Sequence, residues 1–457
     1  MSALDAIFKA YDVRGIVPDQ LDARIARAVG WSFATFSGAP RLIVGRDMRE
    51  SGVELSAAFI DGARQAGAGV VDIGLVSTDL LYFASGHMDA PGAMFTASHN
   101  PAAYNGIKFC LAGASPVGEE SGLGAIRDLA AEVLAGLPED GASARGTLEQ
   151  ADLVDAYAAH VHSFVDVSAL RPLHVVADTA NGMGGLVVPR VLAGLPIRLE
   201  VLYGELDGSF PNHPADPIQP ENLRDLQAAV LDRGADIGLA FDGDADRVFL
   251  VDELAQPVSG SLTTALVAQA MLADHPGSTV LHNLICSRIV PETIVAAGGV
   301  PVRTRVGHSF IKQVMAETGA VFGGEHSGHY YFRDNYRADS GIIAAMVVLQ
   351  EMSRRAQPLS ELLAPLRRYW ASGEVNTEAA DPAGTVEAVA AHLASAGGVV
   401  DRLDGLTVDK GDWWFNLRPS NTEPLLRLNV EASDVSSGER HVDEVLHLVH
   451  SLAPASA

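Results

Sequence analysis

The order of apolar runs along the chain is the feature that most constrains its fold. Three such runs follow one another. An amphipathic helical stretch closed by Gly67 separates the first two, and the third ends in a polar loop. The first set comprises residues 41–47, 70–76 and 93–98. The same order returns at residues 173–185, 197–204 and 237–247, and again at 278–287, 301–309 and 320–332. This repetition predicts three related α/β units of about 100 residues each.

The chain after about residue 367 has a different pattern. Helical and strand-like stretches still alternate there, but no third run ends in a glycine-rich loop of the earlier type. We therefore expect a fourth, smaller α+β domain. Ligands of α/β sheets bind outside the strand ends, so the three polar loops are expected to form one composite site. The expected domains are residues 1–148, 149–254, 255–366 and 367–457.

The charge of the chain limits its partners. It has 32 Lys and Arg residues against 57 Asp and Glu residues, a net charge of −25, which disfavours nucleic acid and anionic membranes. An anionic ligand must then be bound by a few positioned cations, backbone amides or metal ions. No apolar stretch reaches the roughly 20 residues of a membrane span, and we expect no signal peptide. Cys110 and Cys286 lie in apolar runs and are expected to be buried thiols, which favours a cytoplasmic location.

The stretch FDGDADR, residues 241–247, carries the clearest chemical signal. Asp242, Asp244 and Asp246 alternate directly after an apolar run, and their carboxylates would repel each other at close range. A hard divalent cation removes that repulsion, and oxygen ligands suit Mg²⁺. The alternatives are a solvated acidic turn and a calcium-binding loop, but Arg247 stands where an EF-hand loop needs glycine.

A second polar loop, RPSNTEPLLR, lies in the C-terminal domain. It offers a guanidinium group, hydroxyls, an amide and backbone N–H groups within a few residues, and this set suits a phosphate dianion. An ordinary Pro–Ser–Asn turn is the alternative. The side-chain donors of this loop are Arg418, Ser420, Asn421 and Thr422.

The loop GGEHSGHYYF, residues 323–332, places Glu325, Ser327 and His329 at a spacing of two. The glycines of this loop let the backbone come close to a ligand, and carboxylate and hydroxyl groups suit the hydroxyls of a sugar. A zinc site at His326 and His329 is the alternative, but no third ligand stands at a suitable spacing.

Ser98 lies in TASHNP, at the end of the third apolar run. Read alone, it is a cap or turn residue, because Ser-x-Asn-Pro favours turns and the chain has no G-x-S-x-G elbow here. A serine hydroxyl is a poor nucleophile unless it is activated, but it could hold a phosphoryl group and pass it on beside a metal ion. Arg14 in KAYDVRG and His308 in RVGHSFIK are either ligand contacts or surface residues.

Together these four loops resemble those of one enzyme family. TASHNP, DGDADR, GEHSGH and RPSNTEP, in this order and spacing, are similar to the motifs of the α-D-phosphohexomutases, and the resemblance covers essentially the whole chain. It implies an α/β fold, with three related α/β domains that have mixed sheets plus a smaller C-terminal α+β domain around a central cleft. The four domains would carry, in order, a phosphoserine loop, a metal loop, a sugar-binding loop and a phosphate-binding loop.

The resemblance also implies roles for single residues. Ser98 would be the phosphoserine and would supply one oxygen to Mg²⁺, whose other ligands would be Asp242, Asp244 and Asp246. The 3- and 4-hydroxyls of the sugar would contact Glu325 and Ser327. The phosphate that is not transferred would be bound by Arg418, Ser420, Asn421 and Thr422. The catalytic candidates for proton transfer or charge stabilisation are Lys108, Arg247, His308 and His329, and the further substrate contacts are Tyr11, Arg14, His99 and Gly307.

Details of the motifs resemble the bacterial phosphomannomutase/phosphoglucomutase group. His326 and Asn421 stand where phosphoglucosamine mutases tend to carry Gln and Gly. This implies reversible interconversion of mannose 6-phosphate and mannose 1-phosphate, with the glucose phosphates as second substrates, through a hexose 1,6-bisphosphate. Ile285 departs from the pattern, since well-known members carry Lys there. A substrate contact is then either missing or supplied by Arg288.

Three alternatives stay open on the sequence. One is a phosphoglucosamine mutase. Another is a metal-dependent sugar phosphatase with Asp242 as nucleophile, although such enzymes want Thr or Val where Asp246 stands. The third is an inactive relative that only binds sugar phosphates. The expected partners are hexose phosphates, and the expected oligomeric state is a monomer or a weak homodimer.

Overall fold

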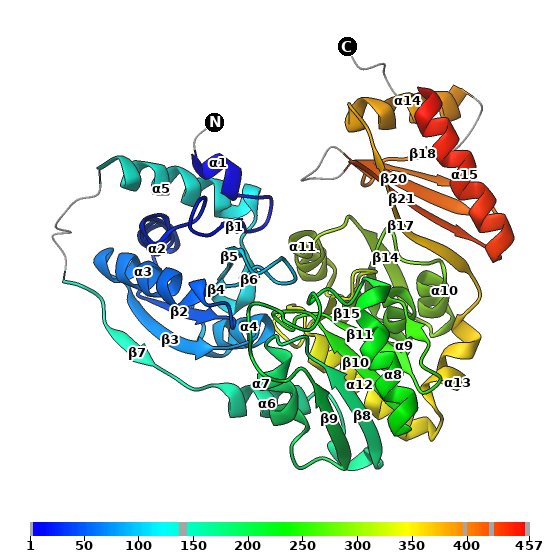
Figure 1. The fold of residues 1–457 in the computed structure, drawn as a ribbon, viewed down its shortest axis with the longest axis horizontal. Coiled ribbons are helices and arrows are strands. Elements are labelled where there is room, and N and C mark those ends of the chain that lie inside the picture. The colour runs from blue at the N-terminus through cyan, green and yellow to red at the C-terminus, as the bar shows by residue number, and fades with distance from the viewer. Residues whose placement is uncertain (1–2, 137–143, 396–399, 420–424, 453–457) are drawn as a thin grey trace.

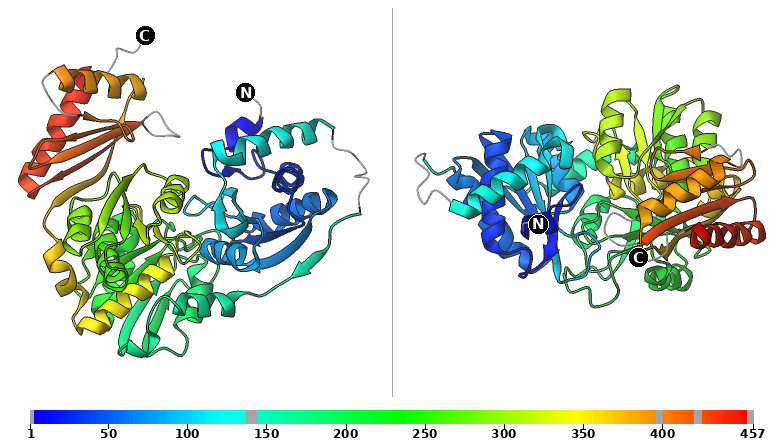
Figure 2. Two further views of the ribbon diagram at one scale, coloured as in Figure 1. Left: turned by 180° about the vertical axis from the view of Figure 1, so that it is seen from behind. Right: turned by 90° about the horizontal axis from the view of Figure 1, so that it is seen from above.

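The computed structural model describes residues 3–136, 144–395, 400–419 and 425–452. These residues form four sheets, one in each of four domains. In Figure 1 the first domain (blue to cyan) lies beside the second and third domains (green to yellow), and the fourth domain (orange to red) sits over the third. Figure 2 shows the same arrangement from behind and from above. Among the described helices, none combines the length and the hydrophobicity that a membrane crossing needs.

Three of the sheets share one topology, which confirms the predicted repeat. In each, the second strand pairs with one side of the first strand and the third strand with the other side, all parallel. A fourth strand then returns antiparallel to the third, so the sheets are mixed as expected. The equivalent strands are β2 (Arg41–Arg46), β3 (Gly69–Leu75), β4 (Gly92–Phe95) and β5 (Tyr104–Leu111); β8 (Leu173–Asp178), β9 (Ile197–Leu202), β10 (Ile237–Phe241) and β11 (Val248–Asp252); and β13 (Thr279–Asn283), β14 (Val300–Thr304), β15 (Phe322–Gly324) and β16 (Tyr330–Phe332).

Short strands extend the first two sheets, and helices connect the strands of all three. The added strands are β1 (Val13–Ile16), β6 (Ser115–Pro116), β7 (Leu148–Gln150) and β12 (Pro257–Val258). The helices of the first domain are α1 (Ala3–Ile7), α2 (Ala23–Ser37), α3 (Ser51–Gln65), α4 (Thr78–Met88) and α5 (Gly124–Gly136). Those of the second and third are α6 (Val154–His162), α7 (Gly184–Leu192), α8 (Arg224–Arg233), α9 (Gly260–Asp274), α10 (Ile289–Ala296), α11 (His308–Thr318), α12 (Gly341–Arg355) and α13 (Leu359–Leu363). The expected domain boundaries stay a prediction, and β7 spans the first of them.

The fourth domain has the α+β architecture that the sequence indicates. Its strands are all antiparallel to their neighbours, in the order β17-β21-β20-β19-β18. The strands are β17 (Trp370–Glu378), β18 (Val400–Asp401), β19 (Leu406–Asp409), β20 (Trp414–Pro419) and β21 (Leu425–Ala432), and the helices are α14 (Pro382–Ser395) and α15 (Val435–Leu452).

The third strands β4, β10 and β15 are buried along their whole length. Their residues are apolar or glycine, as is typical of strands covered on both faces of a sheet. A polar loop follows each strand at the carboxyl end of its sheet, and the key side chains of these loops are also buried. The repeated topology therefore brings three chemically different loops to equivalent positions.

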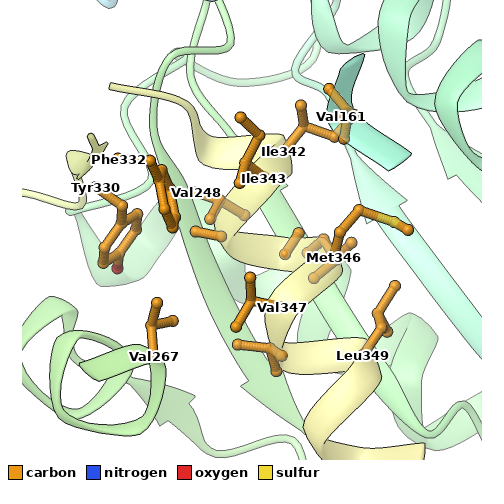
Figure 3. Packing of buried hydrophobic residues seen from close by; sticks show 14 of the residues in the cluster. Val161, Val248, Val267, Tyr330, Phe332, Ile342, Ile343, Met346, Val347 and Leu349 are labelled. Carbon is orange, nitrogen blue, oxygen red and sulfur yellow. The ribbon is translucent and has the colours of Figure 1, made fainter. Parts of the chain in front are cut away.

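One hydrophobic cluster joins the first three domains, in addition to a separate core within the first, and the fourth has a core of its own. Figure 3 shows the shared cluster around α12, where side chains of the second and third domains pack together. The labelled residues are Val161, Val248, Val267, Tyr330, Phe332, Ile342, Ile343, Met346, Val347 and Leu349. Because the first three domains share buried apolar surface, they fix one another in place, and so fix the loops at their sheet edges.

A buried carboxyl group also connects these three domains. Asp79 at the start of α4 is fully buried and accepts hydrogen bonds from the hydroxyls of Ser77, Tyr157 and Ser340, the last at 2.7 Å. Tyr157 belongs to the second domain and Ser340 precedes α12 of the third. Burial raises the pKa of Asp79 to about 7, although these hydrogen bonds favour the carboxylate. The hydrogen bonds of Asp79 thus connect the three domains. Burial disfavours the ionised carboxylate, so the contribution of Asp79 to stability depends on pH.

Replacing Asp79 by Asn tests this description. The pKa of this carboxyl is 3.8 in the unfolded chain and about 7 in the folded protein. Its contribution to stability is therefore largest below about pH 4 and is lost as the pH rises to about 7. Asn does not titrate. The unfolding free energy of Asp79→Asn relative to the wild type should therefore improve by about 1.4 kcal/mol for each pH unit between about pH 4 and pH 7. Urea unfolding across this range measures the difference, and a pH-independent difference would contradict the description.

Candidate active site

The loops that follow β4, β10 and β15 meet at one place. The Ser98 hydroxyl of the first loop donates to Asp242 Oδ2 of the second at 2.8 Å. Arg247 of the second loop forms a backbone bridge with His329 of the third. The approach is close: a Cβ placed on Gly243 would lie 2.4 Å from the Ser98 carbonyl oxygen, so only glycine fits there. The three loops thus meet as the repeat predicts, and the binding of a ligand by them stays a prediction.

Ser98 is held in an unusual backbone conformation. Its φ is +50°, in the left-handed region that non-glycine residues rarely adopt. The Ser98 N–H donates to the Thr96 hydroxyl at 2.9 Å, and the side chain is aimed at the second domain. Arg247 Nη2 lies 3.3 Å from Ser98 Oγ as a second polar contact. The backbone strain and these contacts hold the Ser98 hydroxyl in one position against the carboxylates of the second domain.

Lys108 joins the first domain to the carboxylates of the second. It lies on β5 directly opposite Met94 of β4, and its ammonium group donates to Asp244 Oδ2 at 2.8 Å and to Asp246 Oδ2 at 2.7 Å. Burial would lower the pKa of Lys108, but the two carboxylates outweigh it and raise the pKa well above its usual value. Lys108 therefore stays protonated and offsets part of the repulsion between the aspartates.

Arg247 neutralises Asp242, the aspartate that Lys108 does not contact, and also contacts the serine loop. Its Nε donates to Asp242 Oδ2 at 2.8 Å, and its Nη2 donates to His99 Nδ1 at 2.6 Å. Burial, and then the charges of Arg247 and Arg14, lower the pKa of His99 well below its usual value. The imidazole of His99 is thus neutral and accepts a hydrogen bond, which holds the guanidinium next to Ser98 Oγ.

The carboxylate cluster fits a divalent cation. Asp242, Asp244 and Asp246 are all buried, and one oxygen from each can be chosen so that these oxygens lie within 4.8 Å of one another. Asp244 Oδ1 and Asp246 Oδ1 are buried without a hydrogen bond among the described residues. Burial raises the pKa of Asp242 well above its usual value, against the charge of Arg247. The cluster can therefore accept more positive charge, and its hard oxygen donors suit a metal ion.

The third loop forms a second network beside the carboxylates. Glu325 is buried, and it accepts hydrogen bonds from the Tyr331 hydroxyl at 2.8 Å, from the Asn283 amide at 3.1 Å and from the Gly307 N–H at 3.2 Å. Three donors of this kind fix the carboxylate in one orientation. Glu325 can then present its remaining acceptor capacity to a ligand in a defined direction.

His329 connects the two networks. Its Nδ1 lies 3.0 Å from Ser327 Oγ, and its Nε2 lies 3.8 Å from Asp246 Oδ1. His326 points elsewhere, with its Nδ1 3.1 Å from Ser261 Oγ. The two histidines of this loop thus have different partners, which argues against the alternative of a zinc site.

The N-terminal residues also reach the cleft. Arg14 Nη1 donates to Asn100 Oδ1 of the serine loop at 2.5 Å. Tyr11 lies against Gly307, where an added Cβ would meet the tyrosine oxygen at 2.7 Å. Gly307 has a φ of +127°, so glycine is needed both for the conformation and for the space. Tyr11 also lines a cavity of about 720 Å³ between the first and third domains.

Arg418 belongs to β20 of the fourth domain. It is buried, and its guanidinium pairs with Glu374 at 3.0 Å. The other predicted residues of this loop, Ser420, Asn421 and Thr422, lie outside the described residues, as does the side chain of His308.

Arg288 binds groups of the fourth domain. Its guanidinium donates to Asp409 Oδ1 at 2.6 Å, to the Gly411 carbonyl at 2.5 Å and to the Trp413 carbonyl at 3.4 Å. All three acceptors belong to the fourth domain. Ile285 lines a cavity of about 240 Å³ at the junction of the third and fourth domains, together with His326.

Sequence reasoning missed several residues of the site. Thr78 donates to Asp244 Oδ2 at 2.6 Å, and Arg49 donates to the carbonyl oxygens of the serine loop. Neither lies in a recognisable motif. Their position could have indicated them, because Thr78 follows β3 and Arg49 follows β2 at the same edge of the sheet as Ser98.

Comparison with known proteins agrees with the fold and the loops. Models of four domains of the phosphoglucomutase/phosphomannomutase family match in order: the α/β/α domains I, II and III at residues 5–133, 155–255 and 259–369, and the C-terminal domain at 374–448. A phosphomannomutase of Salmonella montevideo is 39% identical over 453 residues, which is 97% of this chain and 99% of that protein. The phosphohexose mutases of Xanthomonas campestris pv. campestris are 40% identical over 445 residues, 97% of this chain and 98% of theirs.

A solved structure shows the same fold. The crystal structure of a phosphoglucomutase/phosphomannomutase family protein from Burkholderia thailandensis aligns with a TM-score of 0.88 at 32% identity, over 99% of this chain and 98% of that one. The fold and the match are those of the phosphohexomutases, which are intramolecular phosphotransferases. The chain belongs to the phosphoglucomutase/phosphomannomutase family, and the resemblance seen in its four loops is confirmed.

Removing one carboxylate tests the cation site. Binding of Mg²⁺ or Mn²⁺, measured by calorimetry, should be weakened about tenfold or more in Asp246→Asn, because a charged ligand is lost. Asp178→Asn is the matched control: Asp178 is also buried in the second domain, but it contacts His213. Its affinity for the metal should stay near that of the wild type. Equal affinities of the wild type and Asp246→Asn would contradict the site.

Proposed function

We propose that the chain is a phosphomannomutase that interconverts mannose 6-phosphate and mannose 1-phosphate reversibly, with the glucose phosphates as second substrates. The observation that carries this proposal is the Ser98 hydroxyl, buried and hydrogen-bonded to the carboxylate cluster next to the loop of Glu325. Full-length similarity to relatives named phosphomannomutase supports mannose phosphate as the substrate.

The reaction has two phosphoryl transfers. Phosphorylated Ser98 gives its phosphoryl group to the free hydroxyl of a hexose monophosphate: the bond between phosphorus and Ser98 Oγ breaks and a new phosphorus–oxygen bond to the sugar forms. The proton of the sugar hydroxyl is released, and Ser98 ends with a protonated hydroxyl. The hexose 1,6-bisphosphate turns around in the cleft, and its other phosphate returns to Ser98, so the serine is phosphorylated again.

The fixed loops explain how one site handles two orientations of the sugar. A flipped hexose presents its 3- and 4-hydroxyls in roughly the same place, so Glu325 and Ser327 can bind either orientation. The phosphate that is not reacting would always be bound by Arg418 and its neighbours Ser420, Asn421 and Thr422. Positioning of this kind removes much of the entropic barrier to transfer.

Charge neutralisation supplies the rest of the rate enhancement. Asp242, Asp244 and Asp246 would hold Mg²⁺, which when bound would neutralise charge on the transferring phosphoryl group. Arg247 lies 3.3 Å from Ser98 Oγ and can stabilise charge there, oriented by the neutral His99. His329 contacts the carboxylate cluster and is the candidate for moving the proton, whereas Lys108, which stays protonated, can stabilise charge there. Tyr11, Arg14 and Gly307 would line the path of the sugar.

Ile285 bears on specificity. Since Arg288 is used by the fourth domain, we propose that one substrate contact of the well-known members is missing here rather than replaced. The remaining contacts of Glu325 and Ser327 do not distinguish the 2-position of the sugar, where mannose and glucose differ. Acceptance of both hexoses follows from this proposal.

A comparison of substrates on one preparation tests the function. We expect turnover of mannose and glucose phosphates, with kcat/KM values at least as high as that for glucosamine phosphate, because Glu325 and Ser327 do not distinguish the 2-position where these sugars differ. Free phosphate should be released far more slowly than the isomers interconvert. Release at a similar rate would favour the phosphatase alternative. A higher kcat/KM for glucosamine phosphate would favour a phosphoglucosamine mutase, and ligand binding without turnover would favour an inactive relative.

A further inference from the structure

Arg49 is a buried arginine whose guanidinium binds the backbone of the serine loop. Its side chain is 1% exposed. Nη1 donates to the carbonyl oxygens of Pro101 and Tyr104, both at 2.9 Å. Nη2 donates to the carbonyl oxygens of Ser98 at 2.9 Å and Asn100 at 2.6 Å. One side chain thus binds three carbonyl groups of the loop between β4 and β5 and that of the first residue of β5.

The fold explains why Arg49 reaches this loop. β2 and β4 are parallel neighbours, with Arg46 paired to Phe95, so the residues that follow both strands leave the sheet at the same edge. Asp47 fixes the approach: its Oδ1 accepts the Arg49 N–H at 2.9 Å, and its Oδ2 lies 3.3 Å from Arg49 Nε. Thr96 also hydrogen-bonds Asp47, and the Thr96 hydroxyl accepts the N–H of Ser98.

The second domain holds Arg49 from the opposite side. A Cβ on Gly208 would lie 2.7 Å from Arg49 Cα, so the two backbones are in close contact. The ring of Phe210 lies 5.1 Å from the Arg49 guanidinium carbon, within cation–π range. The same ring comes within 3.5 Å of a Cβ placed on Gly243, in the metal loop. Arg49 therefore lies between the serine loop and the segment that packs on the metal loop.

These contacts bear directly on the reacting serine. The left-handed φ of Ser98 persists only if its surroundings over-determine it. The Ser98 carbonyl that Arg49 holds is the same atom on which Gly243 packs. Any displacement of that carbonyl would change the distance between Ser98 Oγ and Asp242. A shift of about 1 Å at a reacting group can cost about 10²-fold in rate.

We propose that Arg49 is a positioning residue for phosphoryl transfer: it holds the Ser98 loop so that the hydroxyl faces the carboxylate cluster, and it ties that orientation to the second domain. The inference rests on the proposed function, since it assigns a role to Arg49 in the transfer from Ser98. Arg49 does not contact the expected path of the substrate. Its effect should therefore fall on the rate of transfer and not on hexose phosphate binding.

The variant Arg49→Lys tests the inference. A lysine has one ammonium group in place of the planar fork and cannot bind four carbonyl groups at once. We expect kcat, and the single-turnover rate of phosphoryl transfer between Ser98 and a hexose monophosphate, to fall about 10- to 100-fold, with KM changed less than about threefold. Loss of stability alone would not give this split when the assay is run well below the melting temperature of the variant.

Arg64→Lys is the matched control. Arg64 is a partly buried arginine of the first domain. Like Arg49 it donates to a backbone carbonyl, that of Gly146 at 2.9 Å, but Gly146 lies outside the serine loop. Its kcat should stay within about twofold of the wild type. An equal fall in Arg64→Lys, or a wild-type kcat in Arg49→Lys, would overturn the inference.

A second variant covers the case in which Arg49→Lys does not fold. Phe210→Leu removes the ring beside the guanidinium and keeps an apolar side chain, so the transfer rate should fall several-fold with KM unchanged. An unchanged transfer rate in the folded Phe210→Leu variant would overturn the inference. A wild-type protein that never transfers a phosphoryl group from Ser98 would refute the proposed function itself, and with it this inference.

Discussion

The pairing of Lys108 with Asp244 and Asp246 is the interaction on which the site depends. Burying three carboxylates within a few ångströms is strongly unfavourable unless positive charge is buried with them. Lys108 comes from the first domain and the aspartates from the second, so the same contacts that offset the repulsion also fix the two domains relative to each other. Ser98 lies in the loop that follows β4, the strand paired with that of Lys108, and its hydroxyl donates to Asp242.

A repeated topology then gives three different loops one shared location. Since each sheet has its third strand next to its first, the loops after β4, β10 and β15 stand at equivalent edges. The common core of the first three domains holds these edges together, and His329 lies where the second and third loops meet. The fourth domain has a separate core and contacts the third domain through Arg288, which donates to Asp409.

The repeat could be predicted because the strands appear in the sequence as apolar runs in a recurring order. The three loops could be predicted because their polar residues follow the third run of each set directly. Other features left no such mark. The fourth strand of each unit, such as β5 with Lys108, was not read from the apolar runs, and mixed sheets were expected only from the family resemblance. Arg49 stands in a polar stretch before α3 that reads as a surface turn, whereas tertiary contacts bury it completely. The use of Arg288 by the fourth domain depends on how two domains dock, which no local pattern encodes.

The central claim is that Ser98 carries the phosphoryl group that is exchanged with the sugar. A direct measurement is to load the protein with a hexose 1,6-bisphosphate labelled in its phosphates, locate the label by peptide mass analysis, and then add unlabelled hexose monophosphate. The account predicts label on Ser98 alone, transferred to the sugar at a rate no slower than turnover, and no labelling of Ser98→Ala. Label on another residue, or label on Ser98 that leaves more slowly than the enzyme turns over, would contradict it.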